Sequence, residues 1–165
     1  MILHLSAALA KKLRAPLSFS NMPVLQTGRA DSWSADILKV QGRARMVLVM
    51  HDASQWPLLI PIEGCGTYEE FLQLLIIFMA GSYLAFDKPF DHENQEIIVT
   101  RRTNRTLIGY MNDAKRCSGL TAIMHLESRG SINWSEITDS LMNTPYSSKN
   151  GFFMPRDKFP NPRTA

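Results

Sequence analysis

Three arginines mark the point in the sequence where side chains could do chemistry. Arg101 and Arg102 follow the predicted strand Glu96–Thr100, and Arg105 opens the helix predicted after Asn104. Free backbone N–H groups give a helix N-terminus a partial positive charge, so a cation there is unfavourable. A bound phosphate or carboxylate would compensate this charge through N–H groups and guanidinium forks. The junction therefore predicts a site for a small anion.

An ion pair within the chain would also compensate these arginines. The acidic segment before the strand, and the first residue of the strand itself, offer four carboxylates. These are Asp87, Asp91, Glu93 and Glu96. The sequence leaves both explanations open, and we favour the ion pair.

Polar residues continue along one face of the same helix. Arg105, Gly109, Asn112 and Arg116 recur at spacings of four, three and four, which places them on one side. Gly109 costs about 1 kcal/mol in a helix interior relative to alanine, and the close approach of a ligand would explain it. Tight packing of the helix on the sheet, with Asn112 bonded to a strand edge, explains it at least as well. Asp113 lies about 100° further round the helix than Asn112.

The histidines and cysteines predict no active site. His51 and Asp52 are the only adjacent pair of histidine and acid, and neighbours in a strand point to opposite faces. The sequence has no phosphate-binding loop, no G-x-S-x-G motif and no H-E-x-x-H motif. Two isolated cysteines, Cys65 and Cys117, make neither a zinc ligand set nor a disulfide framework. We therefore expect no metal and no cofactor, and we assign no catalytic residue.

The hydrophobic pattern around these residues predicts an α+β fold, in which helices pack mainly on one face of a single, mainly antiparallel sheet of about five strands. The predicted strands are Ile2–Leu5, Ala35–Val40, Arg45–His51, Pro57–Ile62 and Glu96–Thr100. The predicted helices are Ala7–Arg14, Thr67–Tyr83, Arg105–Arg116 (which can extend to Leu126 after a break near Gly119) and Trp134–Met142. We expect one domain over residues 1–154 and a Pro-rich tail over residues 155–165.

Three local signals within these elements are specific. The run Met46–Met50 is continuously apolar, which is typical of a central strand covered on both faces. Pro57 and Pro61 cannot donate to a ladder, so their strand should lie at an edge. Thr67 with Glu70 forms a capping box that opens the following helix.

That helix, residues 67–83, is apolar around nearly its whole circumference, which is typical of burial on several sides. A second copy of the chain could cover one side, so we weigh a homodimer through this helix equally against burial in a monomer. The apolar run Phe71–Phe86 is too short to span a membrane, since a transmembrane helix needs about 20 residues. We therefore expect no membrane partner.

Charge is unevenly divided along the chain. Residues 1–46 carry seven Lys and Arg against two Asp and Glu, residues 47–100 carry one against eight, and residues 101–165 carry ten against five. Basic outer segments packed beside an acidic middle explain this division, and an anion-binding face is the alternative. Cysteine usage and the lack of an export signal favour a cytoplasmic location. Residues 15–32 form a long predicted loop and are a candidate for function.

The segment Asn104–Asp113 reads asparagine, arginine, hydroxyl, two apolar residues, glycine, any residue, methionine, asparagine, aspartate. With Ser6–Leu13, Trp33–Ala35 and the turn Thr144-Pro145 before Ser147, it resembles an uncharacterised bacterial family of short proteins, a domain of unknown function. Met142 departs from the family pattern, which has an asparagine there. The resemblance implies a cytoplasmic bacterial protein associated with mobile DNA. It also implies either a shared site or a shared structural lock at Arg105, Gly109, Asn112 and Asp113.

Three functions are consistent with the sequence. The favoured one is a binding or accessory protein that recognises a partner or a small anionic ligand near Arg101, Arg102, Arg105, Gly109, Asn112 and Asp113. An enzyme for a phosphorylated or nucleotide-like substrate is the second, with Arg105 holding the anion and Asp113 or a histidine such as His51 acting as base. Weak nucleic-acid binding through the basic outer segments is the third, and it predicts affinity that falls steeply with salt.

Overall fold

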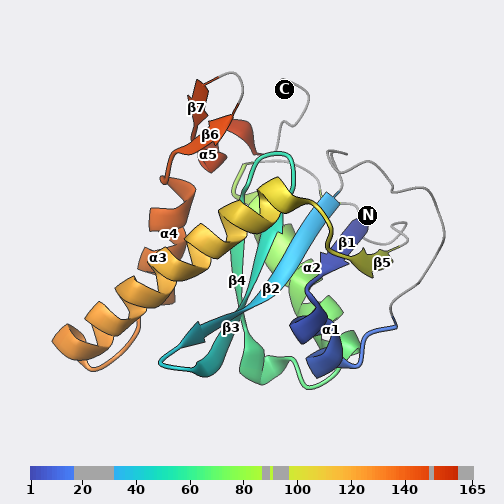
Figure 1. Ribbon diagram of the computed structural model, residues 1–165, viewed down its shortest axis with the longest axis horizontal. Coiled ribbons are helices and arrows are strands. Elements are labelled where there is room, and N and C mark those ends of the chain that lie inside the picture. Colours follow the sequence, from blue (N-terminus) through green and yellow to red (C-terminus); the bar gives the residue numbers. More distant parts are fainter. Residues whose placement is uncertain (17–31, 87–89, 91–96, 149–150, 160–165) are drawn as a thin grey trace.

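The computed structural model describes residues 1–16, 32–86, 90, 97–148 and 151–159 (Figure 1). Its centre is a five-stranded sheet in the order β4-β3-β2-β1-β5. The strands are β1 (Ile2–Leu5), β2 (Ser32–Val40), β3 (Arg43–His51), β4 (Pro57–Pro61) and β5 (Ile98–Arg101). β2, β3 and β4 are antiparallel neighbours, whereas β1 runs parallel to both β2 and β5. The α+β class and the single five-stranded sheet are therefore confirmed.

The apolar run in β3 and the two prolines in β4 place these strands in the sheet as predicted. Along β3, residues 47 and 49 pack on one face of the sheet and residues 46, 48 and 50 pack on the other, and all five are buried. β3 accordingly lies inside the sheet, between β2 and β4. β4 lies at the edge of the sheet. Pro57 and Pro61 have no N–H group to donate, and at the edge no further strand requires one.

Helices and a short hairpin surround this sheet. The helices are α1 (Ala7–Leu13), α2 (Tyr68–Leu84), α3 (Arg105–Arg129), α4 (Trp134–Met142) and α5 (Pro155–Lys158), with the 3-10 turn η1 at Ile62–Gly64. The hairpin consists of β6 (Tyr146–Ser148) and β7 (Gly151–Phe153). Both hydrogen bonds of the predicted capping box between Thr67 and Glu70 are present at the start of α2. Asn104 and Asn133 cap α3 and α4 as the sequence predicts.

α3 runs unbroken for 25 residues, so the break expected near Gly119 is wrong. A Cβ atom at Gly119 would lie 3.5 Å from the carbonyl oxygen of Lys39 on β2. The glycine therefore permits close contact between helix and sheet instead of ending the helix. α3 ends at Gly130, which adopts a left-handed conformation with φ 71°.

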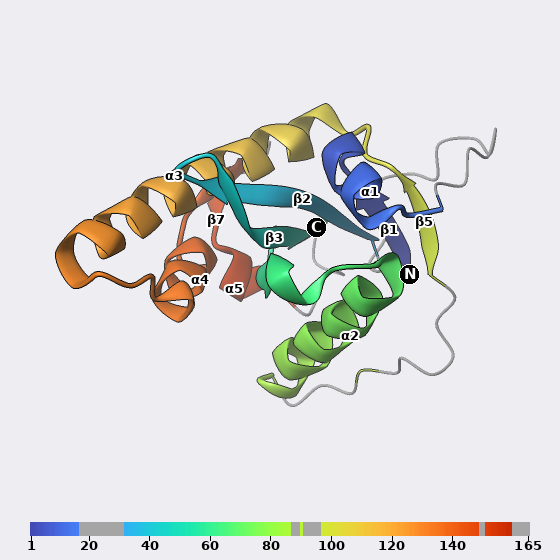
Figure 2. The same ribbon diagram turned by 90° about the horizontal axis from the view of Figure 1, so that it is seen from below.

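The helices cover both faces of the sheet, which corrects the expectation that they pack mainly on one face. Figure 2 shows α2 and α3 on opposite sides of the strands. Trp33 and Phe71 belong to the core beneath α1 and α2, whereas Leu48 and Met111 belong to the core beneath α3 and α4. The physical reason is that β3 and β4 carry apolar side chains on both faces, and each face must be shielded from water.

The packed part of the chain reaches beyond residue 154, where the predicted domain ends. Phe159 is buried, and its ring centroid lies 4.8 Å from that of Trp56 and 5.9 Å from that of Trp33. Phe159 therefore belongs to the core and Pro155 is buried as well, whereas residues 160–165 of the predicted tail lie outside the described residues. Within the described residues, the helices are too short or too polar to cross a membrane.

Candidate functional site

The junction between β5 and α3 directs its arginines to different places. β5 ends at Arg101, and Asn104 caps α3 by accepting a hydrogen bond from the backbone N–H of Leu107 at 3.2 Å. Arg102 and Arg105 flank this cap, one before the helix and one as its first residue. Asn104, the first residue of the predicted motif, therefore has a structural role as the cap of the helix.

Arg102 turns toward the sheet. Its Nη2 lies 3.1 Å from Oδ2 of Asp36 on β2, and its Nη1 lies 3.1 Å from Sδ of Met111. Lys115 on α3 donates to the same oxygen of Asp36. Burial opposes ionisation of Asp36, but hydrogen bonds from Lys115 and Ser6 and the charges of Lys115 and Arg102 hold its pKa below the ordinary value of 3.8. Asp36 is thus a charged anchor that ties α3 to β2.

The ion-pair alternative therefore holds for Arg102, with a partner that the sequence did not suggest. Arg102 and Asp36 are 66 residues apart in the chain and meet because β5 and β2 flank β1. The acids expected to serve this purpose, Asp87, Asp91, Glu93 and Glu96, lie outside the described residues. Because its guanidinium is already bound, Arg102 does not offer a free charge to a ligand.

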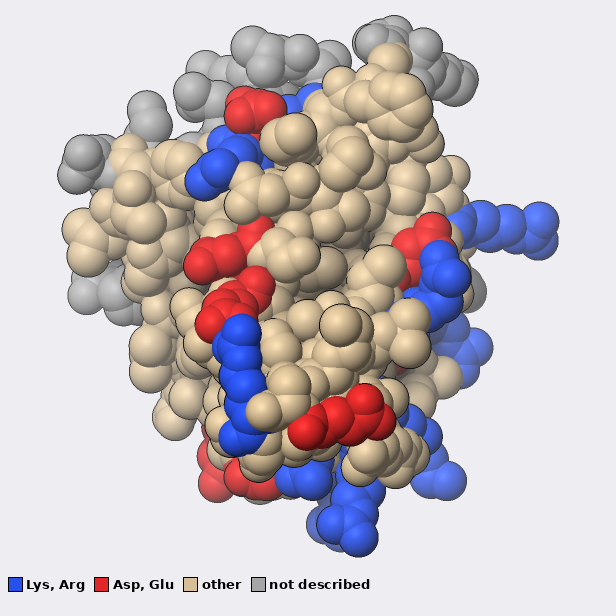
Figure 3. Space-filling view, turned by 90° about the vertical axis from the view of Figure 1, so that its left-hand side faces the viewer, with Lys and Arg blue, Asp and Glu red and all other residues tan. Residues whose placement is uncertain are grey.

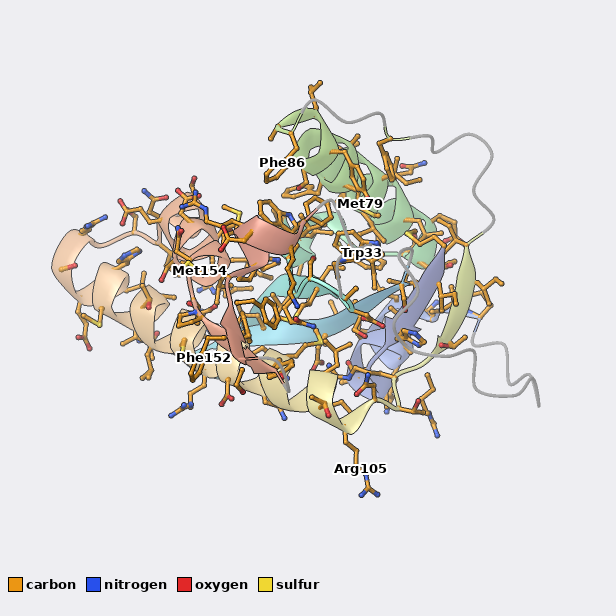
Figure 4. The ribbon with its side chains drawn as sticks, turned by 90° about the horizontal axis from the view of Figure 1, so that it is seen from above. Trp33, Met79, Phe86, Arg105, Phe152 and Met154 are labelled. Carbon is orange, nitrogen blue, oxygen red and sulfur yellow. The ribbon has the colours of Figure 1, made fainter. Side chains whose placement is uncertain are left out.

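Arg105 points the opposite way. Figure 4 shows its side chain extending into solvent from the start of α3, away from the sheet. Within the described part of the chain it has no carboxylate partner. Arg101 is also exposed, at the end of β5. Arg101 and Arg105 are thus exposed to an external anion, whereas the guanidinium of Arg102 is bound to Asp36.

Gly109, Asn112 and Asp113 continue the exposed surface that begins at Arg105, and we call these four residues the outer face of α3. A Cβ atom at Gly109 would meet no atom within 4 Å, so tight packing on the sheet is the wrong explanation for this glycine. Asn112 makes no hydrogen bond to a strand edge in the described structure. The carboxylate of Asp113 lies 3.7 Å from the exposed guanidinium of Arg116, one turn further along.

The β6–β7 hairpin lies beside this part of α3. The Tyr110 hydroxyl donates to the backbone carbonyl of Ser147, and the ring centroids of Tyr110 and Tyr146 are 5.3 Å apart. The motif at 104–113 and the turn that precedes Ser147, both singled out in the sequence, are therefore neighbours in space. On β7, Phe152 is 82% exposed, which is unusual for a phenylalanine (Figure 4).

A line of four hydrogen-bonded side chains lies within the sheet, and we call it the buried relay. Oγ1 of Thr100 is 2.6 Å from Nδ1 of His4, and Nε2 of His4 is 3.0 Å from Oγ of Ser32. Ser32 in turn donates to Oδ2 of Asp52 at 2.6 Å. His4, Ser32 and Asp52 are buried, whereas Thr100 is half-buried.

The hydrogen bonds of the buried relay fix part of its proton arrangement. Ser32 gives its only hydroxyl proton to Asp52, so it accepts from Nε2 of His4. A neutral His4 then accepts at Nδ1 from the Thr100 hydroxyl. Burial lowers the pKa of His4, and the charge of Asp52 only partly opposes this shift. A hydroxyl that donates to a neutral histidine is the arrangement by which histidine acts as a general base.

Sequence reasoning missed the buried relay because its members come from four separate segments. His4 and Thr100 are register partners in β1 and β5, 96 residues apart. No spacing within any one segment brings them together. The cluster follows only once β1 is placed between β2 and β5, and no local pattern indicates that order.

The other described histidines stay apart from the junction. His51 is buried on the α2 side of the sheet, where its Nδ1 lies 2.7 Å from Oγ of Ser54. His125 on α3 lies 3.4 Å from a carboxylate oxygen of Glu136, which Arg129 also binds. Neither histidine converges with Asp113 or Arg105. Among the described residues, no three His, Cys, Asp or Glu side chains gather as metal ligands would.

Basic side chains do not form a patch of one sign on the side of the molecule nearest the end of α3. Figure 3 shows Lys and Arg interspersed with Asp and Glu on that side. The pair Arg129 and Glu136, at 2.8 Å, is one example. Nucleic-acid binding requires a concentrated basic surface, so this side gives that function no support.

Comparison with known proteins places the chain in a family without assigning it an activity. Searches of curated proteins and of solved structures found no match. The family model described as "Domain of unknown function (DUF6933)" matches residues 2–158 of the 165. Because this match covers nearly the whole sequence, the chain belongs to the DUF6933 family.

Proposed function

We propose that this protein is a cytoplasmic, non-enzymatic binding protein that recognises an acidic segment of a partner protein. The binding surface consists of the outer face of α3 together with the exposed end of the β6–β7 hairpin. The observation that carries the proposal is that Arg105 and Phe152 both extend into solvent from elements that contact each other. Arginine and large aromatic residues are the types that contribute most to binding at protein interfaces.

The chemistry of the outer face defines the partner. Arg105 has no carboxylate within the described part of the chain, so it favours an acidic group, and its guanidinium can bind a carboxylate with two hydrogen bonds. Phe152 favours an apolar side chain next to that acid. The open space above Gly109 lets the partner's backbone approach the helix, with Asn112 beside it to accept or donate hydrogen bonds. Arg102 contributes by holding α3 in place through Asp36.

A displayed library of random peptides tests the proposal, because it samples acidic and apolar segments of every order. We expect the wild-type protein to enrich peptides that combine Asp or Glu with a large apolar residue. Binding of these peptides should fall at least tenfold for Arg105→Glu and for Phe152→Ser. Arg43→Glu is the matched control, because Arg43 is an exposed arginine on the β2–β3 hairpin and belongs neither to the outer face of α3 nor to the β6–β7 hairpin. All three variants should fold normally, since substitutions at exposed positions usually change stability by less than about 0.5 kcal/mol.

Two results would contradict this proposal. Enriched peptides without an acidic bias, or equal binding by Arg105→Glu and wild type, would exclude the outer face as the recognition surface. Native mass spectrometry of the purified protein addresses the small-anion alternative. Extra bound mass that is lost in Arg105→Ala would identify a small anion, in place of a protein segment, as the ligand.

The buried relay supports a second candidate function, an enzyme that transfers a group to or from the Thr100 hydroxyl. The neutral imidazole of His4 would accept the proton of Thr100 as the hydroxyl oxygen bonds to the transferred group, and it would return that proton to the departing group. Asp52 would stabilise the imidazolium through Ser32. A fluorophosphonate probe tests this candidate, because it leaves a phosphonyl group on an activated hydroxyl and can be followed by intact mass. The enzyme candidate requires an adduct on Thr100 that His4→Gln abolishes. An unmodified wild-type protein would remove it.

A further inference from the structure

A cavity of about 630 Å³ lies between α2, β4, α4 and α5, away from the outer face of α3. Its volume falls within the range of about 300–1,000 Å³ that is typical of sites for small molecules. We propose that this cavity binds a small amphipathic carboxylate, a molecule with an apolar body and one anionic end. The site is independent of the proposed partner surface.

The walls of the cavity suit an apolar body. Most of the lining residues are apolar, and the largest of them include Trp56, Leu58, Ile77, Phe78, Phe86 and Met142. The ring centroid of Trp56 lies 4.8 Å from that of Phe159, nearly parallel to it, and 5.2 Å from that of Phe86 in an edge-to-face arrangement. Phe86 is the second residue after the end of α2 (Figure 4). These ring contacts hold the aromatic wall in one geometry, so part of the binding surface is formed before a ligand arrives.

The edge strand favours a small molecule over an added β-strand. β4 lines the cavity and has no further neighbour in the sheet. A peptide that extended the sheet would need N–H donors along β4, but Pro57 and Pro61 have none. The occupant must therefore gain its free energy from the apolar space, because backbone pairing is blocked.

Arg156 on the rim defines the anionic end. Its Nη1 donates to Oδ1 of Asn143 at 2.6 Å, and it has no carboxylate partner in the described part of the chain. This bond leaves further guanidinium donors for a carboxylate. Asp157 lies on the same rim and opposes an anion there. The two side chains therefore predict opposite effects of neutralisation on the affinity for a carboxylate.

Gly81 of α2 offers a way to fill the cavity without strain. It lines the cavity, and a Cβ atom there would meet nothing within 4 Å. Gly81→Leu should therefore occupy the ligand's space while improving helix propensity. Gly109→Leu is the matched control, since Gly109 is equally open but lies on α3, away from the cavity.

Calorimetric titration of the full chain with decanoate is the test. We expect binding by wild type and Gly109→Leu, and no detectable binding by Gly81→Leu. Arg156→Gln should weaken binding by about fivefold, the effect expected for an exposed ion pair, and Asp157→Asn should strengthen it by a smaller factor. Melting temperatures of all four variants establish that they fold.

Three outcomes would overturn the proposal. If the wild-type protein shows no binding of decanoate in the titration, the site does not exist. Affinity unchanged in Gly81→Leu would place decanoate elsewhere on the protein. Sedimentation that shows a wild-type dimer, and a monomer for Gly81→Leu, would assign this surface to a second copy of the chain through α2.

Discussion

α2 and α3 cover opposite faces of one sheet, and each carries a glycine whose side-chain position is open. Around Gly81 on α2 the neighbouring surface is apolar and concave, whereas around Gly109 on α3 it is polar and exposed. Neither glycine is required for packing. In contrast, Gly119 on α3 does meet the sheet, through Lys39. A glycine in a helix therefore indicates either a close internal contact or an open surface, and only the fold distinguishes the two cases.

The largest expected loss of stability tests whether the hydrophobic clusters on both faces of the sheet are tightly packed. Leu75 on α2 and Met111 on α3 are each fully buried, in separate clusters. Leu75→Ala and Met111→Ala should each lower the free energy of unfolding by about 2–5 kcal/mol, through lost burial and the cavity left behind. Urea unfolding of the two variants measures this. If either substitution lowered the free energy of unfolding by less than about 1 kcal/mol, the helix at that position would not be tightly packed on its face of the sheet.

The next effect separates the inner anchor of α3 from its outer face. Asp36→Ala leaves Arg102 and Lys115 without their shared carboxylate and should destabilise the protein by about 2 kcal/mol or more, because all three groups are largely buried. Asp113→Ala breaks an exposed pair and should change stability by less than about 0.5 kcal/mol. Thermal unfolding of both variants measures the difference. If the two substitutions changed stability equally, the ion pairs of Asp36 would not stabilise the packing of α3 on β2.

A third effect concerns pH and distinguishes the environments of His4 and Asp36. The pKa of His4 is lowered by burial, so its stabilising effect is present above its ordinary value of 6.5 and is lost as pH falls through the folded value. This effect can change stability by at most about 1.4 kcal/mol per pH unit, since one proton is taken up. His4→Gln should flatten the dependence of melting temperature on pH as the pH falls below about 6.5. The pKa of Asp36 is lowered too, so its contribution is lost only at more acidic pH, below 3.8. A slope that His4→Gln does not alter would assign the acid sensitivity to another group.

The smallest effect returns to the two open glycines. Gly81→Leu and Gly109→Leu should each stabilise the protein by up to about 1 kcal/mol, because leucine has the higher helix propensity and meets no obstacle. Chemical denaturation provides the measurement. Destabilisation by either variant would reveal an unrecognised neighbour at that position. Functional assays then separate them, since decanoate binding should respond to Gly81→Leu and peptide binding to Gly109→Leu.

The sequence predicted the features of this fold that depend on a few adjacent residues. The caps at Thr67, Asn104 and Asn133, and the edge position of β4, follow from side chains and prolines that act on their own backbone. The apolar run Met46–Met50 indicates that both faces of the sheet are covered, but which helix covers which face depends on how the strands are ordered and connected.

The candidate site shows the same limit. Arg102 and Arg105 look equivalent in the sequence, yet one binds Asp36 on a distant strand and the other extends into solvent. The buried relay was likewise invisible, since His4 and Thr100 become neighbours only when β1 pairs with β5. Long-range pairing decides these contacts, and no local pattern encodes it.

The position of β1 has a consequence for how the chain folds. β1 is synthesised before both of its neighbours, and one of them, β5, follows 92 residues after its end, since β1 ends at Leu5 and β5 begins at Ile98. Closing so long a loop is slow, because its entropy is lost before the strands gain their hydrogen bonds. On the ribosome, the sheet therefore cannot be completed until most of the protein has emerged. Until then the outer edge of β1 is open to incorrect pairing, and this waiting period is when the nascent chain is most exposed to aggregation.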